Sequence, residues 1–259
     1  MNLSSLRSAF SLSLLLGLSA PAHALALDPQ YAGLFQNGDG ANSLWVQVKE
    51  DWRGNTYGNQ SWGTGIWSLA DQAQVMGLAS NDPVVVQTLA TRVTQINFAD
   101  QRFITDWGAS WIMPQLAPIF SNTGENQDNW ASRFSGYIAI TAPGAYNFGV
   151  LYDDGFRFSL FGAGGNSLAI QNDGLNPRDR LGFSEDLLLS PGLYAYQLDA
   201  YDRLEAGVVQ LGWTTPQSAN WSVVPQEHLF ASPIPEPSVP MLMLAGLAAI
   251  GLASRRARS

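Results

Sequence analysis

The stretch YNFGVLYDDGFRFSLF, residues 146–161, decides the fold class of this chain. Residues 146–152 and 155–161 are rich in aromatic and aliphatic side chains, and an Asp-Asp pair separates the two runs. Runs of this length bounded by Asp and Gly are typical of consecutive β-strands joined by a short turn. The stretch therefore predicts a β-sheet protein.

Similar runs lie on both sides of this stretch, at residues 45–49, 94–98, 133–141, 167–171, 187–189, 193–201 and 207–213. Gly, Asp, Asn or Pro residues separate them at short spacing, which is typical of β-sandwiches. Residues 71–78 and 82–89 instead predict two short helices, the second with Asp82 as N-cap and Pro83 at its first position. We expect a mainly β, antiparallel sandwich with this small helical insertion covering one sheet.

The composition restricts the classes of partner. The chain has 259 residues, with 21 Asp and Glu against 13 Lys and Arg and a formal charge of −8. A negatively charged surface repels the phosphate backbone of nucleic acids, so we expect no nucleic-acid partner. Divalent cations and neutral sugars are ligands that this negative charge does not exclude. The chain contains no cysteine, so packing, and metal ions if any bind, must stabilise it without disulfides.

The N-terminus has the features of an export signal. Residues 1–24 contain Arg7 and an apolar stretch, and they end at the overlapping small-x-small sites Ala22-His23-Ala24 and Ala24-Leu25-Ala26. This order is typical of a secretory signal peptide with cleavage after Ala24 or Ala26. The secreted domain is then expected to span residues 27–230.

The C-terminus combines three parts. Residues 231–238 form a Pro-rich linker containing Pro235-Glu236-Pro237, residues 239–253 are an apolar run, and residues 254–259 form a basic tail with Arg255, Arg256 and Arg258. The run of about 15 residues is shorter than the roughly 20 of an unaided transmembrane helix, although small residues permit shallow or tilted insertion. The arginines favour a cytoplasmic end. An ordinary tail anchor or a buried C-terminal helix is the alternative.

The order of these C-terminal parts resembles the bacterial PEP-CTERM sorting signal, in which a membrane exosortase cleaves the tail during export. The resemblance implies an exported protein of the cell surface, outer envelope or extracellular matrix. Its implied partners are the Sec export machinery and an exosortase. Before processing, residues 239–253 would anchor it transiently in the inner membrane as a short transmembrane helix.

Residues 130–229 carry a second resemblance. The motifs are Phe134-Ser135-Gly136-Tyr137-Ile138, Pro143-Gly144-Ala145-Tyr146-Asn147-Phe148, Asp153-Asp154-Gly155-Phe156-Arg157-Phe158 and Pro191-Gly192-Leu193-Tyr194. They resemble the protective-antigen (PA-fourteen) module, a lectin-like β-sandwich that recurs in yeast flocculins and bacterial glycosidases. The resemblance implies the same sandwich here, whereas residues 54–80 have no counterpart in the family.

Asp153 and Asp154 are the sharpest candidates for chemistry. Neighbouring side chains of a strand point to opposite faces, so both carboxylates reach one cation only through an unusual backbone. In sugar-binding members of the family a cis peptide joins these aspartates, and calcium binds there. The resemblance implies a calcium site of Asp153, Asp154 and Asp202, the last where the family has Asn. The implied ligand is an extracellular polysaccharide, and the sugar would contact Asp153, Asp154 and Arg203. In the alternative, Arg203 forms an ion pair with Asp202 instead of contacting the sugar.

The sequence is compatible with two hypotheses about function. In the first, the protein is a surface or matrix protein that binds carbohydrate through calcium. In the second, it is a non-catalytic structural matrix protein in which Asp153-Asp154-Gly155 is only a turn, without a sugar or metal site. We do not expect an enzyme, because carboxylates adjacent in sequence seldom flank a glycosidic bond.

Overall fold

The computed structural model describes residues 25–54, 63–107, 112, 116–119, 127–175 and 178–233. The predicted signal peptide lies outside these residues, as do Pro235, Glu236 and Pro237, the apolar run and the terminal arginines. Within the described part of the chain, no helix is both long enough and apolar enough to span a membrane.

The described residues form mostly strands. Their bounds are β1 Leu25–Leu27, β2 Tyr31–Ala32, β3 Ala41–Val48, α1 Leu69–Met76, β4 Val85–Val93, β5 Asn97–Ala99, η1 Phe103–Trp107, β6 Ala117–Pro118, β7 Trp130–Ile140, β8 Gly144–Asp153, β9 Gly155–Phe161, η2 Ala163–Gly165, β10 Ser167–Asn172, β11 Asp179–Gly182, β12 Leu187–Leu189, β13 Gly192–Asp202, β14 Val208–Thr215, β15 Ser218–Val223, η3 Gln226–His228 and β16 Leu229–Phe230.

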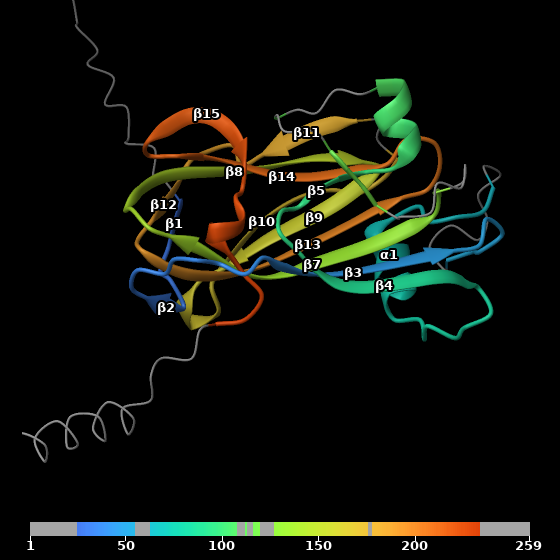
Figure 1. The fold of residues 1–259 in the computed structure, drawn as a ribbon, viewed down its shortest axis with the longest axis horizontal. Coiled ribbons are helices and arrows are strands. Elements are labelled where there is room, and N and C mark those ends of the chain that lie inside the picture. Colours follow the sequence, from blue (N-terminus) through green and yellow to red (C-terminus); the bar gives the residue numbers. More distant parts are fainter. Residues whose placement is uncertain are drawn as a thin grey trace, which may run out of the picture.

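These strands build two sheets (Figure 1). The first has the order β1-β12-β8-β14-β5-β6, with β11 also paired to β8 and β15 to β14. The second has the order β10-β9-β13-β7-β3-β4, with β16 paired to β7 and β2 to β13. Apart from the parallel pairs β1/β12 and β5/β6, neighbouring strands are antiparallel, which confirms the predicted fold class.

The sandwich forms because alternate side chains of both sheets share one core. In β8, Tyr146, Phe148, Val150 and Tyr152 are buried there, and Leu198 of β13 enters the same core from the second sheet. Each large apolar side chain removed from water contributes roughly 1.5–3 kcal/mol before entropy is counted. The alternation that predicted the strands is therefore also what holds the two sheets together.

Helix α1 packs on the second sheet, where it contacts β3, β7 and β13. Ser68 is its N-cap, since the Ser68 Oγ accepts a hydrogen bond from the Asp71 N–H at 3.2 Å. Val75 is buried beside Val46 and Tyr201, on the face of the sheet that does not reach the main core. The first of the two predicted helices, and its place over one sheet, are thus confirmed.

The second predicted helix, at residues 82–89, is wrong. Val85–Val93 form the strand β4, which pairs antiparallel with β3 along its length. Asp82 caps a turn rather than a helix, because its Oδ1 accepts from the Val84 N–H at 3.0 Å. The β-branched residues that follow favour extended backbone, and pairing with β3 outweighs the helix-start signal.

Strand β7 separates two features of functional interest. Asp202, the last residue of β13, lies opposite Trp130 at one end of β7. Phe230 of β16 lies opposite Tyr137, and the chain leaves the sandwich just beyond it. Seven residues of strand at about 3.3 Å each place the exit roughly 23 Å from Asp202 along β7.

Candidate metal centre

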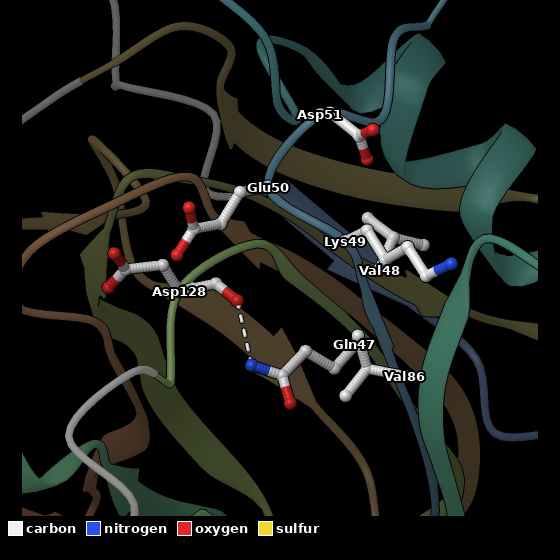
Figure 2. Close-up of a pocket in the computed structure, with 7 residues that line it drawn as sticks. All are labelled: Gln47, Val48, Lys49, Glu50, Asp51, Val86 and Asp128. Atoms are coloured by element: carbon white, nitrogen blue, oxygen red, sulfur yellow. Dashed lines mark hydrogen bonds between the residues drawn. The ribbon is translucent and has the colours of Figure 1, made fainter.

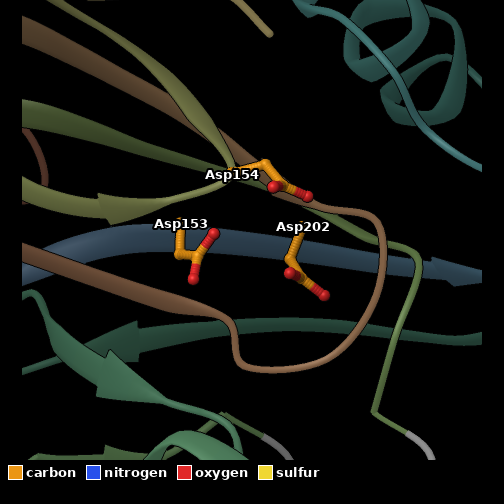
Figure 3. Close-up of side chains that lie close together, drawn as sticks. All are labelled: Asp153, Asp154 and Asp202. Atoms are coloured by element: carbon orange, nitrogen blue, oxygen red, sulfur yellow. The ribbon is translucent and has the colours of Figure 1, made fainter. Parts of the chain in front are cut away.

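Asp153 and Asp154 connect the two sheets. Asp153 ends β8 in the first sheet, and Asp154 immediately precedes β9 in the second. The peptide bond between them is cis, as the resemblance implies. Asp202 ends β13, the neighbour of β9, and one carboxylate oxygen from each of the three residues lies within 4.8 Å of the others (Figure 3). The structure thus brings together the three predicted metal ligands, which we call the acidic cluster.

Two glycines allow the backbone to close tightly around the cluster. A Cβ at Gly155 would lie 2.6 Å from the ring of Tyr201, and a Cβ at Gly207 would lie 2.9 Å from Cγ of Asp202. Side chains do not approach each other that closely, so any residue larger than glycine would push these neighbours away. The glycine of the Asp-Asp-Gly motif therefore has a packing role.

Asp202 is the most unusual member of the cluster. Its side chain is 0% exposed, whereas Asp153 and Asp154 each keep 7%. Both carboxylate oxygens of Asp202 are buried, and no described residue donates a hydrogen bond to them. A buried carboxylate without a donor is unfavourable unless it takes up a proton or contacts a cation. An all-oxygen cluster of this kind fits calcium, which prefers carboxylate and carbonyl ligands.

The electrostatics of the cluster lead to the same conclusion. Burial raises the pKa of Asp153 to about 9, and the adjacent Asp154 carboxylate adds to the shift. Burial, followed by the charges of Asp154 and Asp100, raises the pKa of Asp202 well above its ordinary value. Three carboxylates this close cannot all stay ionised without a positive charge among them, so protons or a cation must compensate.

Arg203 contributes to the cluster through its backbone. Its N–H donates to Asp154 Oδ2 at 2.8 Å. Its side chain donates from Nε to the Thr64 carbonyl oxygen at 2.9 Å, and its Cζ lies 4.1 Å from the centroid of the Trp67 ring. The predicted sugar contact of Arg203 stays a prediction, and its guanidinium packs over Trp67.

Two further acids, which the sequence did not single out, hold the loop between β13 and β14. Asp100 Oδ2 accepts from the Gly207 N–H at 2.6 Å, and Asp128 Oδ1 accepts from the Glu205 N–H at 3.1 Å. Burial raises the pKa of each of these two carboxyls to about 6. Neither residue has a sequence neighbour that suggests a site, so no local pattern could have identified them.

A pocket of about 470 Å³ opens next to this loop (Figure 2). Its lining consists of Gln47, Val48, Lys49, Glu50, Asp51, Val86 and Asp128. The Gln47 amide donates to the Asp128 carbonyl oxygen at 3.0 Å, drawn as the dashed line in Figure 2. Gln47 and Asp202 both pair with Trp130, so the pocket lies at the same end of the sandwich as the cluster.

Comparison with known families agrees with both resemblances. Residues 120–223 match the model of the PA14 domain, and residues 233–258 match that of the PEP-CTERM protein-sorting motif. No curated protein matches the chain in sequence.

Solved structures with similar folds include PA14 domains and adhesin domains. The PA14 domain of the MpAFP antifreeze protein aligns at a TM-score of 0.50 and 14% identity, over 77% of this chain and 94% of that one. The PA14 sugar-binding domain from an RTX adhesin aligns at a TM-score of 0.48 and 14% identity, over 75% of this chain and 99% of that domain. The Epithelial Adhesin 9 A domain from Candida glabrata, in complex with Galb1-4GlcNAc, aligns at a TM-score of 0.49 and 12% identity, over 81% of this chain and 98% of that domain.

Sequence identities of 12–14% are evidence for a similar fold and for nothing about function. This fold agrees with the match of residues 120–223 to the PA14 model. The sorting motif at the C-terminus indicates an exported protein. Residues 120–223 therefore match the PA14 domain, the protective-antigen type of β-sandwich, and residues 233–258 match the PEP-CTERM sorting motif.

Proposed function

We propose that this protein binds carbohydrate through a calcium ion held by Asp153, Asp154 and Asp202. The observation that carries the proposal is the fully buried Asp202 carboxylate, which has two further carboxylates beside it and no hydrogen-bond donor among the residues that the structure describes. Calcium, when bound, supplies positive charge and leaves coordination positions for hydroxyl oxygens, since it takes six to eight oxygen ligands.

The exposure of the cluster defines the direction from which a ligand approaches. Asp202 is closed off completely, whereas Asp153 and Asp154 each retain 7% exposure. A sugar therefore reaches the cluster past Asp153 and Asp154. The chain's formal charge of −8 favours a neutral sugar over a phosphorylated or sulfated ligand.

The sorting motif supports an extracellular ligand, because an exported protein meets polysaccharide outside the cell. We propose extracellular polysaccharide as the ligand, with the Sec machinery and an exosortase as transient partners. Residues 239–253 would hold the protein in the inner membrane until the tail is cleaved.

Calorimetric titration of calcium into the secreted domain tests the metal site. We expect binding by the wild type and a loss of about 100-fold or more in affinity for Asp202→Ala, which removes the ligand oxygens of that side chain. Glu185→Gln is the matched control, since it removes one negative charge at an exposed position and should bind calcium as the wild type does.

Retention on immobilised exopolysaccharide from the producing cells tests the ligand. We expect retention in calcium, release by EDTA, and no retention of Asp153→Ala or Asp154→Ala variants that still fold. If the wild type binds neither calcium nor polysaccharide, the proposal fails and the structural matrix protein without a sugar or metal site becomes the better account.

A further inference from the structure

An apolar patch lies on the outer face of the second sheet, at the end away from α1. Helix α1 covers this face beside Tyr201, at the end of β13, whereas β2 pairs with the start of β13 (Figure 1). Ile138 of β7 points into the main core, so its neighbour Tyr137 points outward. There Phe35 and Tyr137 pack against a separate small core that contains Phe230.

Four apolar or aromatic side chains form this surface, and we call them the exit patch: Tyr31, Leu34, Phe35 and Tyr137. The rings of Tyr31 and Tyr137 meet edge to face with centroids 5.8 Å apart, and those of Phe35 and Phe230 do so at 6.4 Å. Leu34 lies between Tyr31 and Phe35 in the chain and is 69% exposed, and Tyr31 is 39% exposed. A single exposed leucine is common, but one that continues an aromatic surface indicates an interaction site.

The chain leaves the sandwich beside the exit patch. Phe230 is the last residue of β16 and lies opposite Tyr137 of β7. The next residue, Ala231, is held on both sides: its N–H donates to Asp39 Oδ1 at 2.9 Å, and its carbonyl oxygen accepts from the Asn42 amide at 2.7 Å. The place at which the chain leaves the sheet is therefore fixed.

The connection from this point to the apolar run is short. The described part of the sandwich ends at Pro233, and the apolar run begins at Val239. Six residues of chain span at most about 22 Å even when fully extended. Strand β7 alone, with eleven residues, is about 36 Å long. A bilayer that holds residues 239–253 therefore begins nearer to the chain exit than the length of the sandwich.

The chemistry of the exit patch fits the interface of a lipid bilayer. Tyrosine rings are enriched at the level of the lipid headgroups, where the ring is buried and the hydroxyl stays hydrated, and leucine is favoured deeper in the hydrocarbon. The exit patch contains no charged side chain, and the formal charge of −8 disfavours anionic lipids, so a zwitterionic bilayer suits it. Four side chains bind weakly alone, but a short tether keeps them at a high effective concentration at the membrane.

We propose that the exit patch is a membrane-seating surface, through which Tyr31 and Leu34 enter the bilayer interface while residues 239–253 anchor the chain. This inference rests on the anchoring suggested above for residues 239–253. Seating leaves the acidic cluster accessible, because Tyr31 pairs with Leu193 and Asp202 lies nine residues further along β13, roughly 30 Å away.

The test uses the chain from Leu25 to Ser259 in phosphatidylcholine vesicles. Because the chain contains no cysteine, Leu34→Cys gives a single attachment point for the fluorophore NBD. We expect its emission at a shorter wavelength than that of the free, water-exposed fluorophore, and quenching by lipids that carry a nitroxide on the headgroup. Leu188→Cys is the matched control, since Leu188 is 49% exposed on β12 of the first sheet, and its label should show neither change.

A second substitution in the labelled chain tests the patch itself. Tyr31→Asp places a charge beside Leu34 and should abolish the wavelength shift and the quenching. Leu175→Asp adds the same charge at a residue that is 40% exposed after β10, and should leave both unchanged. A shift that disappears when the protein is diluted to one chain per vesicle would show that a second copy, rather than lipid, covers the patch, and would overturn the proposal.

Flotation of the vesicles reports separately on the anchor. If the chain floats with the vesicles and the label at Leu34 behaves as the label at Leu188 does, the exit patch does not contact lipid and the proposal is overturned, while the anchoring by residues 239–253 stands. If the chain does not float, the anchoring fails and this inference fails with it. Neither outcome affects the proposed calcium site, which the calcium titration tests.

Discussion

Gly155 and Tyr201 are in such close contact that a Cβ on Gly155 would stand 2.6 Å from the Tyr201 ring. The Tyr201 hydroxyl in turn accepts from the Gly174 N–H at 2.8 Å and donates to Asp173 Oδ1 at 3.2 Å. The Asp-Asp-Gly turn, β13 and the loop after β10 therefore pack as one unit.

Gly155→Ala should destabilise the domain by about 1–3 kcal/mol, because the Tyr201 ring must move and the turn with it. Urea denaturation measures the loss. Gly77→Ala is the control, since Gly77 has helical backbone angles and a Cβ there meets its nearest atom at 3.4 Å. Equal stability of Gly155→Ala and the wild type would contradict the packing argument.

The calcium-free domain should become less stable as the pH rises. The pKa of Asp153 is raised from 3.8 to about 9 by burial and by Asp154, so the folded state keeps a proton that the unfolded chain has released. The stabilisation is complete below about pH 4 and is lost as the pH rises through about 9. Scanning calorimetry in EDTA should show the melting temperature falling over this range.

The same experiment with calcium should show a rise in melting temperature that grows with pH, because the cation competes with protons for the carboxylates. Magnesium serves as a comparison, since it requires tighter octahedral geometry. A calcium effect that is constant from about pH 5 to about pH 9 would argue against binding at the acidic cluster.

Asp202→Asn should preserve or raise stability in EDTA at neutral pH. The substitution keeps the shape of the side chain and removes a carboxyl group whose pKa is raised well above its ordinary value by burial and by Asp154, so the folded state no longer has to hold a proton there. We expect a melting temperature in EDTA at least equal to that of the wild type, together with a smaller increase on adding calcium than the wild type shows, because an amide oxygen is a weaker calcium ligand than a carboxylate. A variant that is much less stable in EDTA yet stabilised by calcium as much as the wild type would show that Asp202 is structural.

Ser68→Ala should cost about 1 kcal/mol, the usual value of a lost N-cap. The Ser68 Oγ accepts from the Asp71 N–H, and the Asp71 carboxylate accepts from the Trp67 N–H at 3.1 Å. Ser184→Ala, at an exposed position, is the control for urea denaturation. If both variants unfold at the same denaturant concentration, the cap does not stabilise α1.

Signal-peptide cleavage is expected after Ala24 rather than after Ala26. Leu25–Leu27 form β1, paired in register with Leu187–Leu189 of β12, and Leu27 is buried in the core. Cleavage after Ala26 would remove most of this strand and leave the terminal ammonium on Leu27. Mass spectrometry of the secreted protein should therefore find Leu25 at its N-terminus, and a terminus at Leu27 would contradict the expectation.

Much of the fold follows from local pattern. The predicted runs 155–161 and 187–189 coincide with β9 and β12, because short apolar runs there are bounded by Gly, Asp or Pro within two residues. Strands β11 and β15 were not predicted, since both are short and polar and exist through pairing with β8 and β14. Asp82 and Pro83 predict a helix start before β4, although the β-branched residues that follow favour the extended backbone that pairing with β3 requires.

The acidic cluster was only partly visible in the sequence. Asp153 and Asp154 are adjacent, which marks them at once, and Asp202 was identified through the family resemblance. Asp100 and Asp128 support the same loop, yet each is a single acid distant in sequence from the others.

The register of β7 has a consequence for how the protein faces its surroundings. Whatever retains the C-terminus pulls on the tip at Phe230, and the acidic cluster occupies the far tip beside Trp130. In a sandwich attached through its C-terminus, the attachment point and the acidic cluster would therefore lie at different positions along β7, roughly 23 Å apart. A longer tether would change the distance of the cluster from its support, but it would not change the position of the attachment point on the sandwich.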